Sequence, residues 1–365
     1  MNSTTTDSLA AVFTHPLAPF ELRRFALPLL RGTEALVTIR CATLCGSDLH
    51  SYQGRRSSPT PGILGHEMIG ILCALGPDGV RDFRGQPLQL GDRVTWSMVW
   101  SCGECFYCKN GLRPKCEKLL KFGHESISGN QALLGGLAEH CFLPEKTALF
   151  KVPENLPDIV ASPANCATAT VASAFRRVGD CRGCSIVVVG AGMLGLTACA
   201  MASIAGASHI IVLEPSEARR KIALDFGATC VLDSSAPLTQ IRDSVLALTS
   251  GRGVDLCVEF SGYPEGAEMG VRLLRFGGKM VLVGATFPSR PLGIAAEDIV
   301  RRMLTLVGVY NYEPEDLETA LAFLSATLGR FPFASLTSQS FTLKQVNEAF
   351  AFAEKEKAPR VAVLP

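Results

Sequence analysis

Four cysteines lie within one short segment of the chain, at positions Cys102, Cys105, Cys108 and Cys116. Glycine, asparagine and proline lie among them, and these residue types are typical of turns. Four thiolates from such a loop can surround a zinc ion and leave no coordination position open, as in structural zinc sites. A loop with so little apolar content depends on its metal for its fold. Disulfides are the alternative, and we expect them to be absent because the N-terminus shows no secretion signal.

A second set of candidate metal ligands is spread along the first half of the chain. It consists of Cys45, Ser47, Asp48 and His50 in one short segment, and of His66 and Glu67 in a Gly-His-Glu segment. Cysteine, histidine and carboxylate presented by turns suit zinc. Taken alone, His66 fits a buried, hydrogen-bonded histidine of the core better than a metal ligand. Cys166 is isolated in the sequence, and the pair Cys181 and Cys184 has no second pair, which favours a reduced, structural role.

The segment from Ser185 to Glu214 has the pattern of a dinucleotide-binding unit. The β-branched residues 186–189 predict a buried strand, and Gly190, Gly192 and Gly195 follow in the spacing Gly-x-Gly-x-x-Gly. An Ala-rich helix begins at Leu194, and a second apolar strand, 209–213, ends in Glu214, where an acid is expected to bind the adenosine ribose. A transmembrane helix is the alternative, because residues 185–213 carry no charged side chain, but four glycines and a changing period argue against it.

The whole chain of 365 residues is long for a single core and predicts two domains. After Glu214, strands and helices alternate, including a helix at 265–276 followed by a strand at 279–283, which predicts a parallel doubly wound sheet. A net charge of +1 gives no reason to expect nucleic acid or a membrane surface as a partner. We expect a cytoplasmic protein.

Together, these motifs make the chain resemble the zinc-containing medium-chain alcohol dehydrogenases. The resemblance runs from about residue 30 to residue 364 and includes the Cys-Gly-Ser-Asp-x-His segment, the Gly-His-Glu segment, the four-cysteine lobe and the glycine fingerprint. It implies an α/β fold with a GroES-like, β-rich catalytic domain at 1–165, completed by 311–365, and a Rossmann domain that binds NAD at 166–310. It also implies a cleft between the domains that holds a catalytic zinc, in addition to the structural zinc.

The resemblance assigns a role to individual residues. Cys45, His66 and Cys166 match the catalytic zinc ligands, although the segment around Cys166 departs from the commonest glycine-rich form. Glu67 matches a carboxylate near the metal, Asp48 the acid that orients His66, and Ser47 and His50 a proton relay. Met98 matches the substrate pocket. The matched cofactor contacts are Thr170 and Leu194 at the nicotinamide, Arg219 at the adenosine ribose, and Arg360 at the pyrophosphate.

These assignments predict an enzyme that transfers hydride between a small alcohol and NAD. Segments 116–125, 165–171 and 309–314 are similar to a subgroup associated with phosphonate catabolism, so a hydroxyalkylphosphonate is one substrate hypothesis, with Arg55, Arg56, Lys118, Lys121 and His124 as candidate cations. A neutral alcohol or polyol is the alternative substrate. A non-catalytic zinc- and nucleotide-binding protein is the alternative of another class. The family also implies a homodimer or homotetramer.

Overall fold

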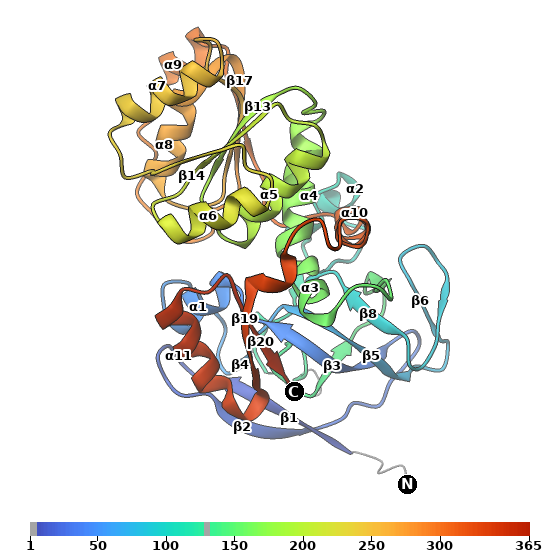
Figure 1. Cartoon of the computed structure of the whole chain (residues 1–365). Coiled ribbons are helices and arrows are strands. Elements are labelled where there is room, and N and C mark those ends of the chain that lie inside the picture. The colour runs from blue at the N-terminus through green and yellow to red at the C-terminus, as the bar shows by residue number, and fades with distance from the viewer. Residues whose placement is uncertain (1–5, 128–131) are drawn as a thin grey trace. The chain divides into compact units, whose positions relative to one another are not determined.

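The computed structural model of the chain describes residues 6–127 and 132–365, which form two compact units (Figure 1). The first unit comprises Met1–Ala169, Tyr312–Leu328 and Phe333–Pro365. The second comprises Thr170–Asn311 and Gly329–Pro332.

The first unit is rich in β-structure. Its strands are β1 (Asp7–Phe13), β2 (Glu21–Ala26), β3 (Ala35–Thr43), β4 (Gly62–Ile63), β5 (Glu67–Leu75), β6 (Val80–Arg81), β7 (Pro87–Leu88), β8 (Arg93–Trp96), β9 (Val99–Trp100), β10 (Leu120–Lys121), β11 (His140–Leu143), β12 (Leu149–Lys151), β19 (Thr337–Thr342) and β20 (Arg360–Leu364). Its helices are α1 (Gly46–Tyr52), α2 (Phe106–Lys109), α3 (Asp158–Ala161), α10 (Pro314–Ala326) and α11 (Val346–Glu356), with short 3-10 turns at Arg113–Lys115, Ser162–Asn165, Phe333–Leu336 and Leu343–Gln345.

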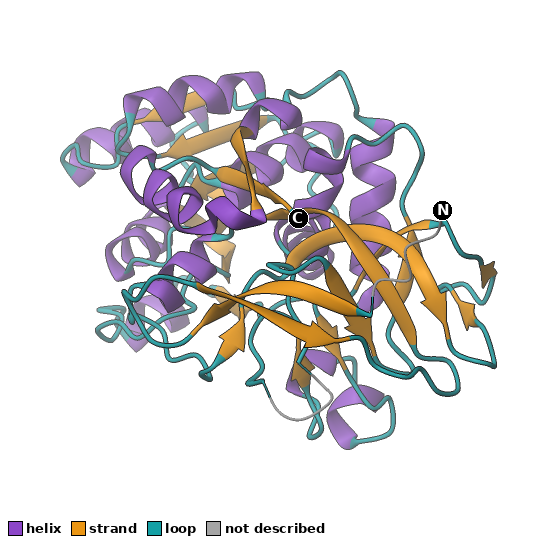
Figure 2. Cartoon of the chain, turned by 90° about the horizontal axis from the view of Figure 1, so that it is seen from below, coloured by secondary structure: helices purple, strands orange, loops and turns teal. Residues whose placement is uncertain are grey.

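The main sheet of this unit joins the two ends of the chain. Its strands follow the order β12-β8-β5-β3-β20-β19, and β11 also pairs with β3. Strand β20 is antiparallel to β3, with Ala362 opposite Thr43. Several of these strands are long and curved (Figure 2). The last strand of the chain is therefore built into the sheet that carries the N-terminal half.

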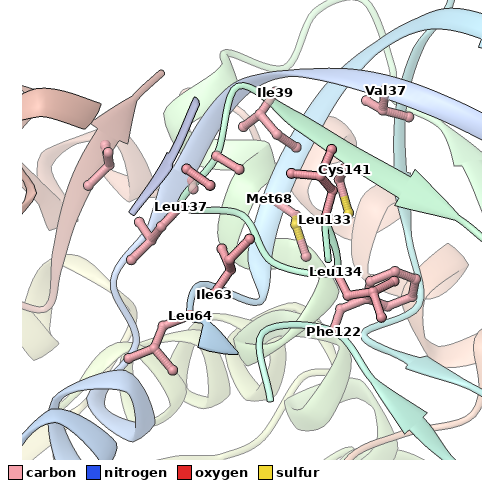
Figure 3. Close-up of a cluster of buried hydrophobic side chains, with 14 of the residues drawn as sticks. Val37, Ile39, Ile63, Leu64, Met68, Phe122, Leu133, Leu134, Leu137 and Cys141 are labelled. Carbon is pink, nitrogen blue, oxygen red and sulfur yellow. The ribbon is translucent and has the colours of Figure 1, made fainter. Parts of the chain in front are cut away.

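The apolar core of the first unit lies against the segment that carries the Gly-His-Glu motif. Leu64 and Met68, which flank this motif, are buried, and Figure 3 shows them among Ile63, Leu137 and Phe122. Burying a side chain of this size contributes about 1.5–3 kcal/mol. The core thus fixes the backbone of His66 and Glu67 from both sides.

The second unit is a parallel sheet with helices in the connections. Its elements are α4 (Ala167–Val178), whose first residues belong to the first unit, β13 (Ser185–Val189), α5 (Met193–Ile204), β14 (His209–Leu213), α6 (Glu217–Asp225), β15 (Cys230–Leu232), α7 (Leu238–Leu248), β16 (Val254–Glu259), α8 (Pro264–Leu273), β17 (Leu274–Leu282), α9 (Ala296–Arg301) and β18 (Thr305–Gly308). The strand order is β15-β14-β13-β16-β17-β18, and every pairing is parallel. This is the doubly wound order of dinucleotide-binding domains, which confirms the predicted fold class.

Strand β13 and its glycine loop form as the sequence predicts. All five residues of β13 are buried, as expected of a central parallel strand. Gly190 has a φ of +92°, and a Cβ added to Gly195 would lie 1.8 Å from the carbonyl oxygen of Gly190. A side chain at position 195 would therefore push the start of α5 away from the strand.

One element boundary differs from the prediction. The helix expected at 265–276 ends at Leu273, and β17 starts at Leu274 and runs through Gly277 and Gly278. Strand β17 pairs with β16 from Val254 opposite Leu274 onward, with a register irregularity after this pair. In the described ranges, no helix combines the length and the apolar character needed to cross a bilayer.

Candidate active site and metal centres

The first unit brings together four potential metal ligands from three separate segments. Cys45 ends the turn after β3, His66 and Glu67 lie at the start of β5, and Cys166 follows a 3-10 turn. Donor atoms of these four side chains all lie within 4.8 Å of one another. The structure thus places Cys166 beside Cys45 and His66, although it is isolated in the sequence.

Asp48 holds the metal-binding residues in place. Its carboxylate lies 3.2 Å from Nδ1 of His66, and both side chains are fully buried. The same carboxylate accepts hydrogen bonds from the backbone N–H groups of Cys45, at 2.9 Å, and Gly65, at 3.3 Å. A carboxylate on one imidazole nitrogen fixes the ring orientation and leaves the other nitrogen for a metal. Burial lowers the pKa of His66, but Asp48 and Cys45 outweigh it and raise this pKa to about 10.

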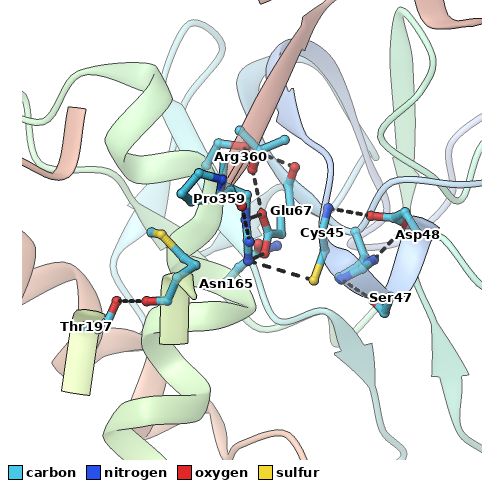
Figure 4. A network of polar contacts seen from close by, with 12 residues as sticks. Cys45, Ser47, Asp48, Glu67, Asn165, Thr197, Pro359 and Arg360 are labelled. Atoms are coloured by element: carbon cyan, nitrogen blue, oxygen red, sulfur yellow. Dashed lines mark hydrogen bonds and ion pairs between the residues drawn. The ribbon is translucent and has the colours of Figure 1, made fainter. Parts of the chain in front are cut away.

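Glu67 is bound to Arg360 rather than left free. Arg360 Nε and Nη2 donate to its two carboxylate oxygens at 2.6 and 2.5 Å, and Thr43 Oγ1 donates to it at 2.7 Å (Figure 4). Arg360 Nη2 also lies 3.8 Å from Sγ of Cys45. Burial raises the pKa of Glu67 to about 7 against the opposing effect of Arg360. The pyrophosphate contact expected of Arg360 stays a prediction, because its guanidinium is engaged here.

The two cysteines of this cluster shift each other's pKa in opposite directions. A hydrogen bond from Cys166 lowers the pKa of Cys45 well below its usual value, and the positive charge of Arg360 adds to this effect. The same bond, together with burial, raises the pKa of Cys166. A buried thiolate of this kind needs a cationic partner.

The donor set of this cluster fits zinc. Two sulfurs and one imidazole nitrogen are ligands that zinc prefers, and three such ligands leave a fourth position for a substrate. The carboxylate of Glu67 is the fourth donor nearby, and its pairing with Arg360 directs it toward the guanidinium. We therefore treat Cys45, His66 and Cys166 as the candidate catalytic zinc ligands.

The short helix α1 carries the two residues of the expected proton relay. Ser47 Oγ lies 3.3 Å from Nε2 of His66. His50 lies in the last turn of α1 and is half-buried. Burial and the nearby charges of Arg55 and Arg56 lower its pKa. The backbone N–H groups of these arginines donate to the carbonyl oxygen of His50 at 2.9 and 3.1 Å, so the chain turns back over the histidine.

The four-cysteine lobe forms a closed cluster. The Sγ atoms of Cys102, Cys105, Cys108 and Cys116 lie within 4.8 Å of one another, and all four cysteines are free. Backbone N–H groups point at the sulfurs: Cys105 and Glu104 donate to Cys102 at 3.4 Å, and Lys118 donates to Cys116 at 3.3 Å. Bonds from backbone N–H groups lower the pKa of Cys105 to about 6. This set fits a structural zinc ion, so the described residues form two candidate zinc sites.

A cavity of about 410 Å³ opens at the carboxyl ends of the strands in the second unit. Gly190, Gly192, Glu214 and Arg219 line it together with Tyr263 and other residues. Ligands of doubly wound sheets bind at this edge. Of the other expected cofactor contacts, Gly195 packs against Gly190, Leu194 lies in the first turn of α5, and Thr170 is buried in α4. Their contacts with a cofactor stay predictions.

Glu214 ties the glycine loop to the next helix. Its carboxylate accepts from the N–H of Ala191 at 2.8 Å and from the N–H of Ser216 at 3.1 Å. Arg220 is engaged elsewhere, because it donates to the carbonyl oxygen of Glu214 and lies 3.4 Å from Asp233. Arg219 is thus the arginine of this pair that lines the cavity.

Sequence reasoning did not assign a role to Tyr312. This buried residue donates from its hydroxyl to the carbonyl oxygen of Asn165, and the hydroxyl accepts from the N–H of Met98 at 3.0 Å. It thereby joins the residue before Cys166 to the expected substrate-pocket residue Met98. No local pattern indicates this contact, since Tyr312 and Asn165 lie 147 positions apart.

Comparisons with known proteins agree with this geometry. Residues 31–154 match the alcohol dehydrogenase GroES-like domain, and residues 194–326 match the zinc-binding dehydrogenase domain. L-threonine 3-dehydrogenase from Pyrococcus furiosus is 32% identical over 309 residues, which is 82% of each chain. The chain belongs to the zinc-binding alcohol dehydrogenase family. It is therefore a zinc-dependent oxidoreductase that acts on CH–OH groups with NAD(P), and its fold is a GroES-like domain with a Rossmann-type sheet.

Solved structures show the same fold. An alcohol dehydrogenase from Thermotoga maritima has a TM-score of 0.92 at 28% identity and covers 98% of this chain and 99% of its own. Benzyl alcohol dehydrogenase from Acinetobacter calcoaceticus has a TM-score of 0.85 at 27% identity, with the same coverage. A protein from Sinorhizobium meliloti described as a zinc-binding dehydrogenase was solved with NADP and has a TM-score of 0.85 at 26% identity, over 99% of this chain and 100% of its own.

Proposed function

We propose that this dehydrogenase transfers hydride between NAD and a small alcohol that carries an anionic group, with a hydroxyalkylphosphonate as the specific candidate. The observation that carries the proposal is the positive charge of Arg55 and Arg56. It acts on His50 of the expected proton relay and, from Arg56, on His124, whose ring lies 5.0 Å from that of the candidate ligand His66. In the described part of the chain, neither arginine forms an ion pair with a carboxylate. An anionic substrate would supply the missing partner.

Each residue around the cluster would have a different role in the reaction. When bound, zinc would act as a Lewis acid on the alcohol oxygen. Asp48 would hold His66 in its ligating orientation, and Arg360 would keep Glu67 from closing the fourth position. Ser47 would accept the alcohol proton and pass it toward His50 and solvent. We also propose that residues 1–165 with 311–365 form the catalytic domain and that residues 166–310 bind the dinucleotide, in a homodimer or homotetramer.

Positive charge gathers on one side of the cluster. Arg55 and Arg56 lower the pKa of His50, and Arg56 and Lys121 lower the pKa of His124, each in addition to burial. Arg56 is half-buried, which strengthens its interaction with an anion compared with a fully solvated arginine. The charge pattern supports an anionic substrate over a neutral alcohol or polyol.

L-Threonine is the second candidate, because the relatives from Pyrococcus furiosus and Thermococcus kodakarensis are L-threonine 3-dehydrogenases. Its carboxylate would meet the same arginines. Both substrate hypotheses therefore predict that activity depends on the positive charge of the arginines. The phosphonate and the carboxylate differ in size and in the number of oxygens.

The test measures NADH formation with three substrates: a hydroxyalkylphosphonate, L-threonine and a neutral alcohol of equal chain length. We expect the highest kcat/KM for the phosphonate, and we expect Arg55→Gln with Arg56→Gln to reduce its advantage over the neutral alcohol about tenfold or more. Arg242→Gln, which changes an exposed arginine of α7, is the control. If kcat/KM is highest with L-threonine, L-threonine replaces the phosphonate as the proposed substrate. If kcat/KM shows no preference for either anion, the anionic-substrate proposal is wrong and only the assignment as an alcohol dehydrogenase remains.

His66→Ala tests the non-catalytic alternative. In an enzyme, this change removes NADH formation from a folded protein, because one of three metal ligands is lost. If wild-type protein with two zinc ions forms no NADH with any alcohol, the non-catalytic alternative is correct.

A further inference from the structure

His124 is a buried histidine whose ring nitrogens have no hydrogen-bond partner among the described residues. Its side chain is 8% exposed, and neither Nδ1 nor Nε2 is paired. Leaving a buried polar group unpaired costs about 1–3 kcal/mol, and most such groups in native proteins have a partner. The described residues therefore leave this ring available to bind a group of a substrate.

The ring of His124 lies next to a candidate zinc ligand. Its centroid is 5.0 Å from the centroid of the His66 ring, and the two ring planes are tilted by 32°. Trp96, Asn165 and Thr168 also have unpaired buried atoms, but no ring contact joins them to a metal ligand. Among the unpaired buried groups of the described residues, His124 is thus the one whose ring contacts a candidate zinc ligand.

The backbone around His124 is built to hold it there. Gly123 has a φ of +73°, and a Cβ added to it would lie 2.6 Å from the carbonyl oxygen of Gly65. The loop therefore lies directly against the residue before His66. On the far side of His124, Ser126 forms a bridge with Gly62, and the N–H of Ile127 donates to the carbonyl oxygen of Pro61 at 2.8 Å.

The loop is also fixed within itself. The N–H of His124 donates to the carbonyl oxygen of Lys121 at 3.0 Å, and the carboxylate of Glu125 accepts from the N–H of Lys121 at 2.7 Å. A backbone fixed on both sides of His124 limits the freedom that the residue loses when it binds a ligand. Such pre-organisation is expected of a recognition residue rather than of a side chain that only fills space.

The chemistry of the ring selects the kind of ligand group. An imidazole keeps at least one N–H donor in either protonation state. Burial lowers the pKa of His124, and the positive charges of His66, Lys121 and Arg56 lower it further. A donor in positive surroundings favours an oxygen that carries negative charge.

We propose that His124 is a specificity-determining residue: its ring N–H donates a hydrogen bond to an anionic oxygen of the substrate, and Arg56 supplies positive charge to the same group. The inference deepens the proposed function and rests on it for the identity of the bound molecule. Phosphonate and carboxylate oxygens share the chemistry that His124 would recognise.

The binding test uses ethylphosphonate, which has no hydroxyl group and cannot be oxidised. Calorimetry on the zinc-loaded protein compares wild type with His124→Phe, which keeps an aromatic ring against His66, and with His124→Gln, which keeps an N–H donor. We expect His124→Phe to weaken binding about ten- to a hundredfold and His124→Gln to retain part of the affinity. His140→Phe is the matched control, because His140 is a half-buried histidine of β11 whose Nδ1 is also unpaired.

The kinetic test compares a hydroxyalkylphosphonate, L-threonine and a neutral alcohol in the same variants. We expect His124→Phe to lower kcat/KM for the preferred anionic substrate and to leave kcat/KM for the neutral alcohol unchanged. The variant should contain as much zinc as wild type. Equal losses for both substrates, or ethylphosphonate binding that does not change in His124→Phe, would overturn the inference. Failure of the proposed function looks different: ethylphosphonate would bind through His124, yet no alcohol would yield NADH.

Discussion

At the residue scale, two buried carboxylates beside the same metal ligands have different surroundings. Asp48 contacts His66 and two backbone N–H groups, so every interaction it makes is with the segments that carry ligands. Glu67 faces a guanidinium instead; burial raises its pKa to about 7, and the charge of Arg360 opposes this rise. Removing Arg360 would leave a buried carboxylate unpaired, which is strongly destabilising. Asp48 therefore orients His66, whereas Glu67 and Arg360 each provide the partner for the other's buried charge.

Glu214 carries the prediction about the cofactor. Its carboxylate lines the cavity and would repel a 2′-phosphate, while it accepts from ribose hydroxyls. We expect kcat/KM for NAD to exceed that for NADP about tenfold or more, and we expect Glu214→Ala to narrow this gap. Glu217→Ala removes a neighbouring acid that does not line the cavity and is the control. Comparable kcat/KM for both cofactors in wild type would refute the preference.

At the element scale, two glycines of the same loop differ in the space that the structure leaves for a side chain. A Cβ at Gly195 would lie 1.8 Å from the carbonyl oxygen of Gly190, whereas a Cβ at Gly192 would meet nothing within 4 Å. We expect Gly195→Ala to displace α5 from β13, to lower the melting temperature and to weaken NADH binding at least tenfold. Gly192→Ala should keep the melting temperature of wild type. NADH fluorescence and thermal unfolding measure both effects, and equal unfolding of the two variants would contradict the packing argument.

Asp255 joins three strands at their amino ends. It accepts from the N–H and hydroxyl of Ser185, which begins β13, both at 2.8 Å, and from Arg275 of β17 at 2.6 Å. Burial would raise its pKa, but these bonds outweigh burial and lower it below the usual value. A carboxyl with a depressed folded-state pKa stabilises the fold above its unfolded pKa, near 3.9, and loses this contribution as the pH falls through the folded-state pKa.

We therefore expect Asp255→Asn to lower the free energy of unfolding by about 1–3 kcal/mol at pH 7. The difference from wild type should shrink as the pH falls below about 4. Denaturant unfolding at several pH values measures it. Asp243→Asn, an exposed change in α7, should have an effect within about 0.5 kcal/mol at every pH. A difference between Asp255→Asn and wild type that is independent of pH would show that charge is not its cause.

Some features of the fold and of the site depend on residues close together in the sequence, and others depend on contacts between distant residues. The four-cysteine lobe and the order of strands and helices follow from local spacing, so the sequence predicts them. The end of α8 does not, because the pairing of Leu274 with Val254 converts residues with a helical pattern into strand. The partnership of Glu67 and Arg360 spans 293 positions, and no local pattern could reveal it. The contact of His124 with His66 likewise depends on the packing of Gly123 against Gly65.

At the scale of the whole molecule, the two candidate zinc sites have separate purposes. The lobe draws all four ligands from residues 102–116, so its metal organises one loop. The cluster of Cys45, His66 and Cys166 draws its ligands from three segments that the sheet and core already hold in place. Loss of the first metal should therefore affect stability, and loss of the second should affect activity.

This separation predicts the metal content and the behaviour of two variants. Elemental analysis of wild type should give two zinc ions per chain. Cys102→Ser should retain about one and unfold at a lower temperature, because the lobe has little apolar content to hold it without metal. His66→Ala should also retain about one, but it should unfold at a higher temperature than Cys102→Ser and form no NADH. Cys184→Ser, a half-buried cysteine outside both clusters, should keep two zinc ions and full activity. Active wild-type protein with one zinc ion or none would refute the two-site arrangement, and equal destabilisation by Cys102→Ser and His66→Ala would refute the division between a folding metal and a catalytic one.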